Sequence, residues 1–352
     1  MKYSFIIPVY NRPDEVDELL DSLTRQECCD FEVVVVEDGS AVPCRDVCDR
    51  YADRLDLHYY NKENSGPGQS RNYGAERAQG EYLIVLDSDV VLPPGYLSAV
   101  DAELAERECD AFGGPDSAHP SFTPVQKAIS YSMTSFFTTG GIRGGKKKLD
   151  KFYPRSFNMG IRRDVYERLG GFSRMRFGED IDFSIRIFKA GCRCRLFPAA
   201  WVWHKRRTDF RKFWRQVYNS GIARINLYKK YPESLKLVHL LPMVFTVGVT
   251  GTLLLLFFGF LPYMLGTVHV FPTLGNAMAA LGCIGLLGII LYIIALFIDS
   301  SWENHSVKIG VLSIRAAFTQ LMGYGCGFLS AWWKRCLLGQ SEFSAYNKTF
   351  YK

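Results

Sequence analysis

Two aspartates one residue apart, Asp87 and Asp89, directly follow an apolar run of strand length at residues 83–86. Prolines at 93 and 94 close the segment, so the run is typical of a buried strand that ends at two carboxylates. Ligands of open α/β sheets collect beyond the carboxyl ends of the strands. Paired carboxylates suit Mg²⁺ or Mn²⁺, ions that usually share their ligands with substrate phosphates. The pair predicts a metal and phosphate site, with a simple polar turn as the alternative.

Three other groups of residues could act beside this pair. Asp38 ends a second apolar run, and Glu179 and Asp180 precede a segment with apolar residues at helical spacing. The glycine-rich stretch 66–72 opens a predicted helix, where free backbone N–H groups favour phosphate, and Arg71 within it could add a bidentate clamp. Each group alone is also typical of a turn, a loop or a helix cap. All of them together, in this order, favour one shared site.

The segments that must position these residues alternate between strands and helices. Apolar runs and helical spacing predict strands at 3–10, 31–36, 55–60, 83–86 and 110–114, and helices at 14–26, 44–52, 66–79 and 96–108. This alternation predicts an α/β fold with a mostly parallel sheet and right-handed crossovers. After a less regular stretch at 117–155, helices are predicted at 163–169 and 180–190 and strands at 194–197 and 200–204. Within that stretch, residues 140–148 are rich in glycine and lysine and predict a mobile basic loop.

Residues 237–298 form a stretch of 62 residues without a single Lys, Arg, Asp or Glu. A membrane span needs about 20 such residues, so we predict two spans, near 237–265 and 274–298, joined by a turn at 266–272. A buried helical hairpin of a soluble protein is the alternative. A third apolar segment, 307–333, contains Arg315 and would carry lysines outside if it crossed, so an interfacial or re-entrant helix is favoured over a third span.

A basic block precedes the first predicted span. Residues 193–236 contain twelve Lys or Arg against two acidic residues, and a basic helix is predicted at 210–231. Nucleic-acid binding is one interpretation of such a block. Its place beside a membrane favours attraction to anionic lipid headgroups, and it would keep the preceding domain cytoplasmic. We therefore expect membrane lipids, and no nucleic acid, as partners.

The amino terminus does not have the pattern of a secretory signal. Its apolar core is short, is interrupted by Pro8 and is not followed by a small-residue cleavage site. The ten cysteines show no C-x-x-C pairing and are typical of a reducing compartment. We expect the first 230 or so residues to stay on the side of the membrane where they are made.

Six ordered motifs give residues 3 to about 230 a strong resemblance to family 2 glycosyltransferases. The motifs are FIIPVYN at 5–11, VEDGS at 36–40, the stretch 66–72, DSD at 87–89, NMG at 158–160 and GED at 178–180. The C-terminal part is similar only to the membrane hairpins of some members. The resemblance implies a GT-A fold, which is Rossmann-like with helices flanking a mostly parallel sheet, and an inverting enzyme that uses a nucleotide-sugar donor.

The resemblance also implies a function for individual residues. It implies that the donor is bound by Pro8, Tyr10, Asp38, Gly66, Gly68, Arg71, Asp87 and Ser88. It implies that Asp180 is the general base and that Asn158, Gly160 and Glu179 hold the acceptor. For the metal, Mn²⁺ or Mg²⁺, it implies Asp89 and His204, although His204 is equally typical of a polar residue near a membrane.

The charges fit the chemistry of such a transfer. Loss of a nucleoside diphosphate builds negative charge, which a divalent ion and backbone N–H groups offset, while inversion needs a base on the opposite face. The Q-x-x-R-W motif of processive relatives has no good match, because the nearest segment, 216–220, lacks the Arg-Trp pair. A single-addition enzyme is therefore favoured over a polymerase.

We expect a catalytic domain at 1–230, with a nucleotide-sugar-binding half at 1–114 and an acceptor half at 115–230, followed by a membrane region at 231–352. The hypothesis is sugar transfer to a lipid-linked saccharide at the cytoplasmic face of a bacterial inner membrane, in polysaccharide or glycolipid synthesis. Transfer to polyprenyl phosphate is the alternative within the class. A sugar nucleotidyltransferase and a non-catalytic membrane scaffold are the alternatives from other classes.

Overall fold

The structure is a computed structural model that describes residues 1–117, 119, 121–140, 152–205, 208–265 and 272–345. By their contacts, residues 1–120 and 147–205 form one compact unit, and residues 121–146 and 206–352 form a second. The predicted loop at 140–148 and the predicted turn at 266–272 fall almost wholly outside the described residues.

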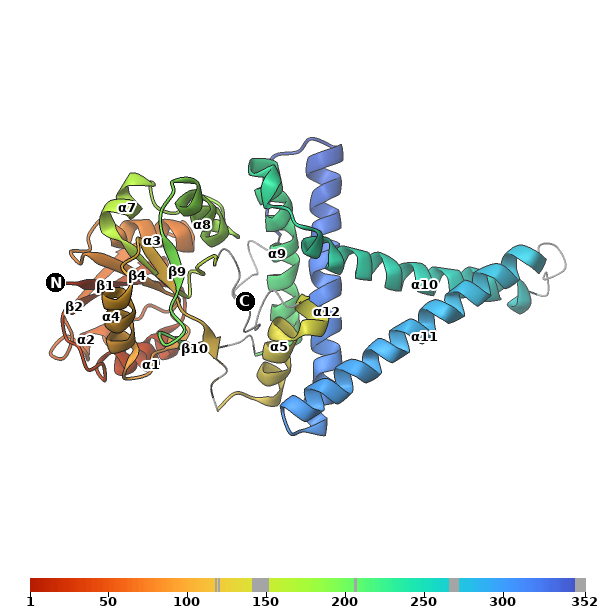
Figure 1. The fold of residues 1–352 in the computed structure, drawn as a ribbon, viewed down its shortest axis with the longest axis horizontal. Helices are drawn as coiled ribbons and strands as arrows, with labels where there is room; N and C mark the ends of the chain where they lie inside the picture. The colour runs from red at the N-terminus through yellow and green to blue at the C-terminus, as the bar shows by residue number, and fades with distance from the viewer. Residues whose placement is uncertain (118, 120, 141–151, 206–207, 266–271, 346–352) are drawn as a thin grey trace. The chain divides into compact units, whose positions relative to one another are not determined.

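The first unit is built on a seven-stranded sheet (Figure 1). Its strands, in spatial order, are β3 (Leu57–Lys62), β2 (Phe31–Asp38), β1 (Tyr3–Val9), β4 (Tyr82–Leu86), β8 (Asn158–Arg162), β6 (Ala111–Gly113) and β9 (Cys194–Leu196). Only β8 runs antiparallel to its neighbours in this sheet. The prediction of a mostly parallel α/β sheet is confirmed. Because the chain reverses its direction of winding between β1 and β4, a ligand crevice is expected at their carboxyl ends.

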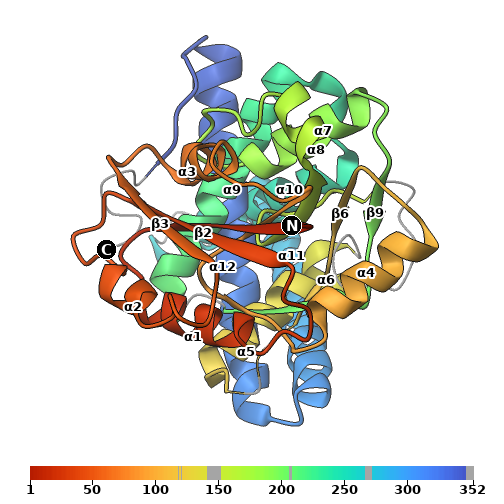
Figure 2. The same ribbon diagram turned by 90° about the vertical axis from the view of Figure 1, so that its left-hand side faces the viewer.

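Helices cover both faces of this sheet, as Figure 2 shows. On one face lie α1 (Pro13–Leu23), α2 (Arg45–Asp49) and α4 (Tyr96–Glu106). On the other lie α3 (Pro67–Ala75), α7 (Arg163–Arg168) and α8 (Glu179–Lys189). Alternate residues of β1, β2 and β4 enter the two hydrophobic cores, and nearly all are fully buried. The continuous apolar runs of the sequence are thus explained by strands buried on both faces.

A small three-stranded sheet lies beside the large one in the chain's first unit. It consists of β5 (Val90–Val91), β10 (Val202–His204) and β7 (Asp116–Ser117), with β10 in the middle. In the antiparallel pairing of β5 and β10, His204 lies opposite Val90, which directly follows Asp89. This ladder brings His204, near the end of the first unit, next to Asp87 and Asp89.

The second unit is helical. Its helices are α5 (Pro124–Thr134), α6 (Phe136–Thr139), α9 (Phe210–Lys230), α10 (Leu241–Met264), α11 (Pro272–Glu303) and α12 (Val307–Ala331), with short helical turns at Pro232–Ser234, Leu237–Leu240 and Trp332–Leu337. Helices α9 and α5 pack along α12, while α10 and α11 form a hairpin that extends to one side of α12 (Figure 1).

Glycines allow α12 to lie very close to its neighbours. A Cβ atom on Gly327 would lie 2.0 Å from the carbonyl oxygen of Tyr218 in α9, and one on Gly325 would lie 2.1 Å from the hydroxyl oxygen of Thr246 in α10. A Cβ on Gly221 of α9 would lie 2.2 Å from the carbonyl oxygen of Tyr324. Since real Cβ atoms do not approach so closely, glycine is required at these contacts.

The stretch 117–155 is less regular in sequence, yet it contains α5, which begins with a capping box of Thr123 and Gln126. By contact, residues 206–230 group with the C-terminal helices, because the apolar face of α9 packs on α12. The functional boundary near residue 230 stays a prediction. The segment 307–333 contains one continuous helix, Val307–Ala331, and its place at or across the membrane also stays a prediction.

Two helical stretches of the described chain, Leu237–Met264 and Thr273–Glu303, are long and apolar enough to cross a membrane. This rests on length and composition alone. Within their most apolar windows only 22% and 11% of the residues are buried in the structure, so few of these side chains belong to a protein core.

The contact between α9 and α12 can be tested with Gly327→Ala. Although alanine favours a helix by about 1 kcal/mol, its Cβ would overlap the Tyr218 carbonyl, and overpacking costs about 1–3 kcal/mol, so a net loss of stability is expected. Thermal unfolding in detergent measures the change. Gly288→Ala in α11 is the matched control, because no atom lies within 4 Å of its added Cβ. Equal melting temperatures for the two variants would contradict this packing.

Candidate active site

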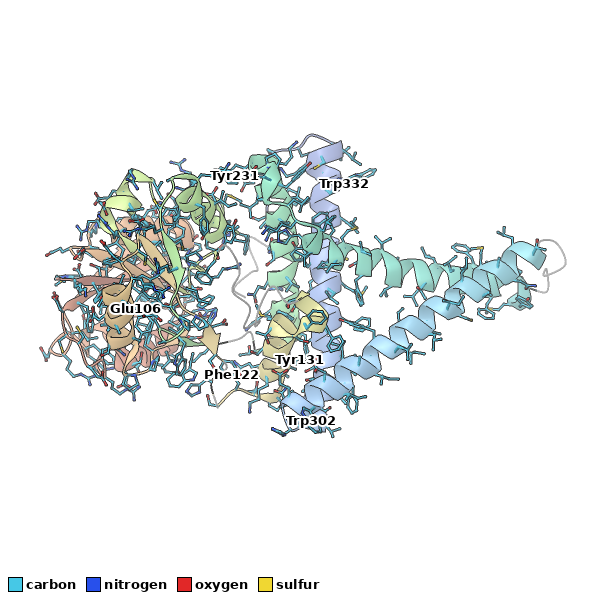
Figure 3. All side chains as sticks on the ribbon, viewed as in Figure 1. Glu106, Phe122, Tyr131, Tyr231, Trp302 and Trp332 are labelled. Carbon is cyan, nitrogen blue, oxygen red and sulfur yellow. The ribbon has the colours of Figure 1, made fainter. Side chains whose placement is uncertain are left out.

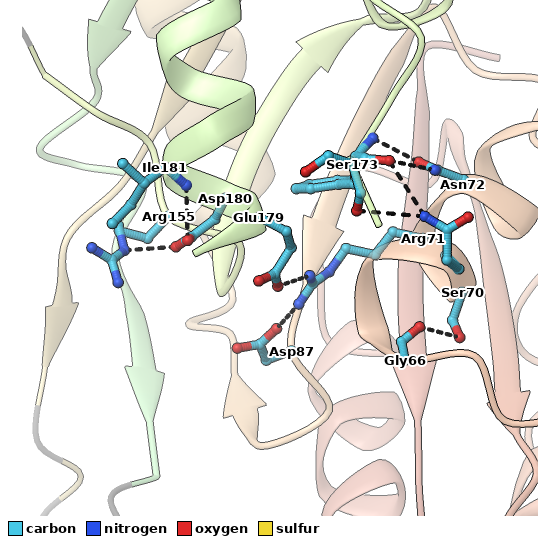
Figure 4. Close-up of polar contacts among 12 residues, drawn as sticks. Gly66, Ser70, Arg71, Asn72, Asp87, Arg155, Ser173, Glu179, Asp180 and Ile181 are labelled. Carbon is cyan, nitrogen blue, oxygen red and sulfur yellow. Dashed lines mark hydrogen bonds and ion pairs between the residues drawn. The ribbon is translucent and has the colours of Figure 1, made fainter. Parts of the chain in front are cut away.

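Arg71 lies at the centre of the site, on α3, where it bridges two acidic residues from distant segments (Figure 4). Its Nη2 atom lies 2.7 Å from Oδ1 of Asp87, at the end of β4, and its Nη1 atom lies 2.8 Å from Oε1 of Glu179, at the start of α8. The side chain is only 3% exposed. Both ends of its guanidinium are therefore used to hold carboxylates.

Glu179 has an unusual electrostatic environment. Burial raises the pKa of its carboxyl above the ordinary value; Arg71 opposes that rise and the neighbouring Asp180 adds to it. The Arg71 guanidinium stays charged, because Asp87 and Glu179 raise its pKa against the opposing effect of burial. Arg71 is thus the fixed positive charge that allows two carboxylates to approach each other here.

Asp87, Asp89 and His204 form a group that could hold a metal ion. One ligand atom from each lies within 4.8 Å of the others. The Nε2 atom of His204 lies 3.3 Å from Oδ1 of Asp89, and the imidazole stacks on the ring of Phe157 at 4.8 Å between ring centres. Two carboxylates and an imidazole suit Mn²⁺ well and Mg²⁺ less well, because Mg²⁺ prefers oxygen ligands. The donor set therefore fits the metal that the resemblance implies.

Two charged residues that the sequence did not single out lie beside these ligands. Asp116 of β7 places Oδ2 at 3.8 Å from Nδ1 of His204, on the other side of the ring from Asp89. Arg12 directly follows the FIIPVYN motif, which contains most of β1. Its Nη1 atom lies 2.5 Å from Oδ2 of Asp89. Nothing in the sequence relates Asp116 to His204, whereas Arg12 adjoins the FIIPVYN motif and could have been found there.

Asp38 organises the glycine-rich loop. Its carboxylate accepts hydrogen bonds from the backbone N–H groups of Ser65 and Gly66, both at 2.9 Å, and pairs with the Lys62 ammonium. Gly66 has a φ of +91°, which favours glycine, and α3 begins directly after it. Gly68 packs closely, since an added Cβ would lie 3.2–3.3 Å from Ser173, Phe172 and Glu179. The loop before α3 is thereby fixed.

The residues expected around the base pocket come from the ends of neighbouring strands. Pro8 in β1 pairs with Val36 of β2, two residues before Asp38, and Tyr10 follows β1. Asn11 joins the two strand ends, because its side-chain oxygen accepts from the N–H groups of Ala41 and Val42 at 2.7 and 3.0 Å. Ser88 is buried between the two aspartates.

Asp180 lies at the start of α8 next to Glu179. Its Oδ2 atom is 2.8 Å from Nε of Arg155, and its Oδ1 atom accepts from the N–H of Ile181 (Figure 4). Arg155 is 38% exposed and was not identified from the sequence. The described residues thus bring the candidate base to the same edge as Arg71 and the metal group, on a different element.

Asn158 and Gly160, expected to hold the acceptor, have packing functions in this structure. Asn158 is fully buried; its side chain accepts from the Tyr96 hydroxyl at 2.6 Å and donates to the Ala200 carbonyl at 2.8 Å. A Cβ on Gly160 would lie 2.0 Å from the ring of Phe112. Both belong to β8 inside the sheet, and their part in acceptor binding stays a prediction.

Comparison with known proteins agrees with this geometry. Residues 4–170 match the profile of the family described as "Glycosyl transferase family 2". The poly(ribitol-phosphate) beta-N-acetylglucosaminyltransferase TarS of Staphylococcus aureus is 35% identical over 114 residues, 31% of this chain and 20% of TarS. The probable glycosyltransferase YdaM of Bacillus subtilis is 25% identical over 317 residues, 84% of this chain and 72% of YdaM. The chain matches only about a fifth of the length of TarS.

A solved structure shares the fold over most of the chain. The mannosyltransferase PcManGT from Pyrobaculum calidifontis, in complex with GDP-Man and Mn²⁺, has a TM-score of 0.56 and 17% sequence identity. The alignment covers 95% of this chain and 88% of that chain.

Asp116 lies 3.8 Å from Nδ1 of His204, beyond hydrogen-bond distance, and we predict that the two close to a hydrogen bond that orients His204 when an ion binds. A carboxylate on the far nitrogen of a metal-binding imidazole fixes the ring, and its loss typically costs at least about tenfold in metal affinity. We expect Asp116→Asn to weaken Mn²⁺ binding by about that factor in calorimetry.

The matched control for this variant is Asp56→Asn. Asp56 also lies beside an imidazole nitrogen, that of His58 at 3.2 Å, but on a surface pair away from the site. Mn²⁺ binding to Asp56→Asn is expected to equal that of the unchanged chain. An Asp116→Asn variant with full Mn²⁺ affinity would show that Asp116 does not orient His204.

Proposed function

We propose that this chain, which carries a family 2 glycosyltransferase domain at residues 4–170, transfers a sugar from a nucleotide-sugar to an acceptor hydroxyl with inversion. The observation that carries the proposal is the bridge made by Arg71. It ties Asp87 of the metal group to Glu179, whose neighbour Asp180 is the candidate base. A donor site and an acceptor site are thereby joined through one buried residue.

The donor side of the site is made by strand ends and by the start of α3. Asp38, Pro8 and Tyr10 form the proposed base pocket, and the glycine-rich loop places backbone N–H groups of α3 toward phosphate. A divalent ion bound by Asp87, Asp89 and His204 would stabilise the negative charge of the leaving diphosphate. Negative charge at the phosphates is therefore met by the ion and by fixed backbone dipoles.

The acceptor side is made by α8. In-line attack with inversion needs a base on the face of the sugar opposite the leaving group. Asp180 lies at the start of α8, an element that carries none of the proposed metal ligands. Its contact with Arg155 holds the carboxylate in place, and the partly exposed guanidinium can rotate away when a hydroxyl takes its position. Glu179, held by Arg71, shapes the wall next to this position.

The helical unit supports a membrane location and a lipid-linked acceptor. Many large apolar side chains of the α10–α11 hairpin are exposed, among them Phe257, Leu287 and Leu291. Figure 3 shows side chains along the two helices of this hairpin, which extend from the side of α12, with Trp302 and Trp332 near opposite ends of α12. If the hairpin crosses a bilayer, α12 lies along its surface with exposed tryptophans at the headgroup level. This arrangement supports an interfacial α12 rather than a third span.

Replacing the candidate base tests the reaction. We expect Asp180→Asn to lower transfer to a hydroxyl acceptor by about 10²–10⁴-fold, because general base catalysis is lost, while nucleotide-sugar binding is retained. Release of the nucleoside diphosphate and donor binding are measured side by side. Asp164→Asn is the control, since Asp164 also pairs with an arginine, Arg162, but on the surface.

Other outcomes of this assay point to other functions. Near-normal turnover of Asp180→Asn would contradict the base assignment and favour an ionised acceptor such as polyprenyl phosphate, which needs no base. Release of pyrophosphate from UTP and a sugar phosphate would show a nucleotidyltransferase instead.

Charges placed in the hairpin test the membrane proposal. Leu287 and Leu291 are 56% and 58% exposed on α11, and each arginine at the centre of a span costs about 2.5–3.5 kcal/mol of insertion free energy. We expect Leu287→Arg with Leu291→Arg to lower the share of protein that stays in membranes after a carbonate wash. Val42→Arg with Leu196→Arg, at exposed sites of the first unit, is the control and is expected to leave that share unchanged. Full retention of the α11 variant would contradict a spanning hairpin.

A further inference from the structure

We propose that Arg12 binds the diphosphate of the donor and is released for that purpose when a divalent cation takes its place on Asp89. This inference rests on the proposed function, because it needs a donor with a diphosphate. It concerns a residue that the family resemblance did not assign.

Position is the first reason. Arg12 follows β1 and Asp89 follows β4, and these two strands are neighbours at the point where the sheet reverses its winding. Ligands of such sheets bind in the crevice at this point. The guanidinium of Arg12 is therefore on the side of the sheet where a nucleotide would lie, and it reaches the metal group directly.

Competition for one carboxylate is the second reason. Nη1 of Arg12 lies 2.5 Å from Oδ2 of Asp89, while Oδ1 of the same carboxylate faces Nε2 of His204 at 3.3 Å. A cation held between Asp87, Asp89 and His204 draws on the same negative charge. The doubly charged ion and the guanidinium repel each other, so metal binding weakens the contact between Arg12 and Asp89.

The third reason is that Arg71 is buried and both of its Nη atoms are already paired with carboxylates. The sequence favoured Arg71 as the phosphate clamp, but both Nη atoms of this buried side chain hold carboxylates. Arg12 is 19% exposed, so its guanidinium can turn toward solvent and ligand. A single metal ion leaves some phosphate oxygens of a diphosphate without a positive partner. A planar guanidinium can bind two such oxygens at once.

The backbone beside Arg12 is held in place. Asn11 has a φ of +54° and its side chain accepts from the N–H groups of Ala41 and Val42. The residue before Arg12 is thus tied to the loop after β2. An exchange of the Arg12 guanidinium from Asp89 to phosphate can therefore take place without movement of this backbone.

Binding measurements on the full chain in detergent test this inference. Mn²⁺ alone is titrated first, and UDP and GDP are then titrated at saturating Mn²⁺, by calorimetry. For Arg12→Met we expect tighter binding of Mn²⁺ alone, because a competing charge is gone. We expect binding of the preferred nucleoside diphosphate to weaken about tenfold, as for the loss of one charged hydrogen-bonded contact.

Two further variants serve as comparisons. Arg25→Met, at an exposed position just after α1, removes an arginine that pairs with Asp21 at 2.8 Å and is expected to change neither affinity. Arg12→Lys keeps the charge but loses the planar fork, so its diphosphate affinity is expected between those of the unchanged chain and Arg12→Met. Thermal unfolding of Arg12→Lys and Arg12→Met also shows whether the fold tolerates substitution at position 12.

Opposite results separate this inference from the proposed function. Unchanged or weaker Mn²⁺ binding by Arg12→Met would overturn the competition, and unchanged diphosphate binding would overturn the phosphate contact. If the unchanged chain itself bound neither UDP nor GDP with Mn²⁺, the proposed use of these donors would fail, and the phosphate contact of Arg12 with it.

Discussion

The buried ion pairs of Arg71 are the constraint on which the rest of the site depends. Arg71 and Glu179 are buried while the Asp87 side chain is 31% exposed, and removing a charge from water costs several kcal/mol per ion unless it has well-placed partners. Arg71 meets this condition by joining α3, the end of β4 and the start of α8. Loss of Arg71 would leave the buried Glu179 carboxylate without this partner. The three segments, distant in sequence, are thereby held at one spacing.

Local sequence signals identified the parts of the site but not its contacts. Asp38, Asp87 and Asp180 stand where an apolar strand ends or a helix begins, and such positions are recognisable without a structure. The bridge from Arg71 to Glu179 spans more than a hundred residues, so only the folded sheet brings the two together. For the same reason Arg12 was not connected with Asp89, nor Asp116 with His204.

Other features of the fold are not evident from local sequence for physical reasons. Asn158 lies in the motif NMG, and its amide also satisfies a buried hydroxyl and a buried carbonyl, a packing function that only the folded sheet reveals. Helix α5 was missed although Thr123, Pro124 and Gln126 form a recognisable helix start, because the glycines after it dominated the local composition. The close packing of α9 on α12 is not evident from the sequence, because it combines an apolar face of α9 with glycines that let the two backbones approach.

The ladder between β5 and β10 has a thermodynamic consequence. It places His204 opposite Val90, so the backbones that carry two candidate metal ligands, Asp89 and His204, are already joined by hydrogen bonds. Ligands held in this way lose little conformational entropy when they take up an ion. Uptake of the ion is then accompanied by a small change in heat capacity, unlike a site that folds around its metal and buries apolar surface as it does so.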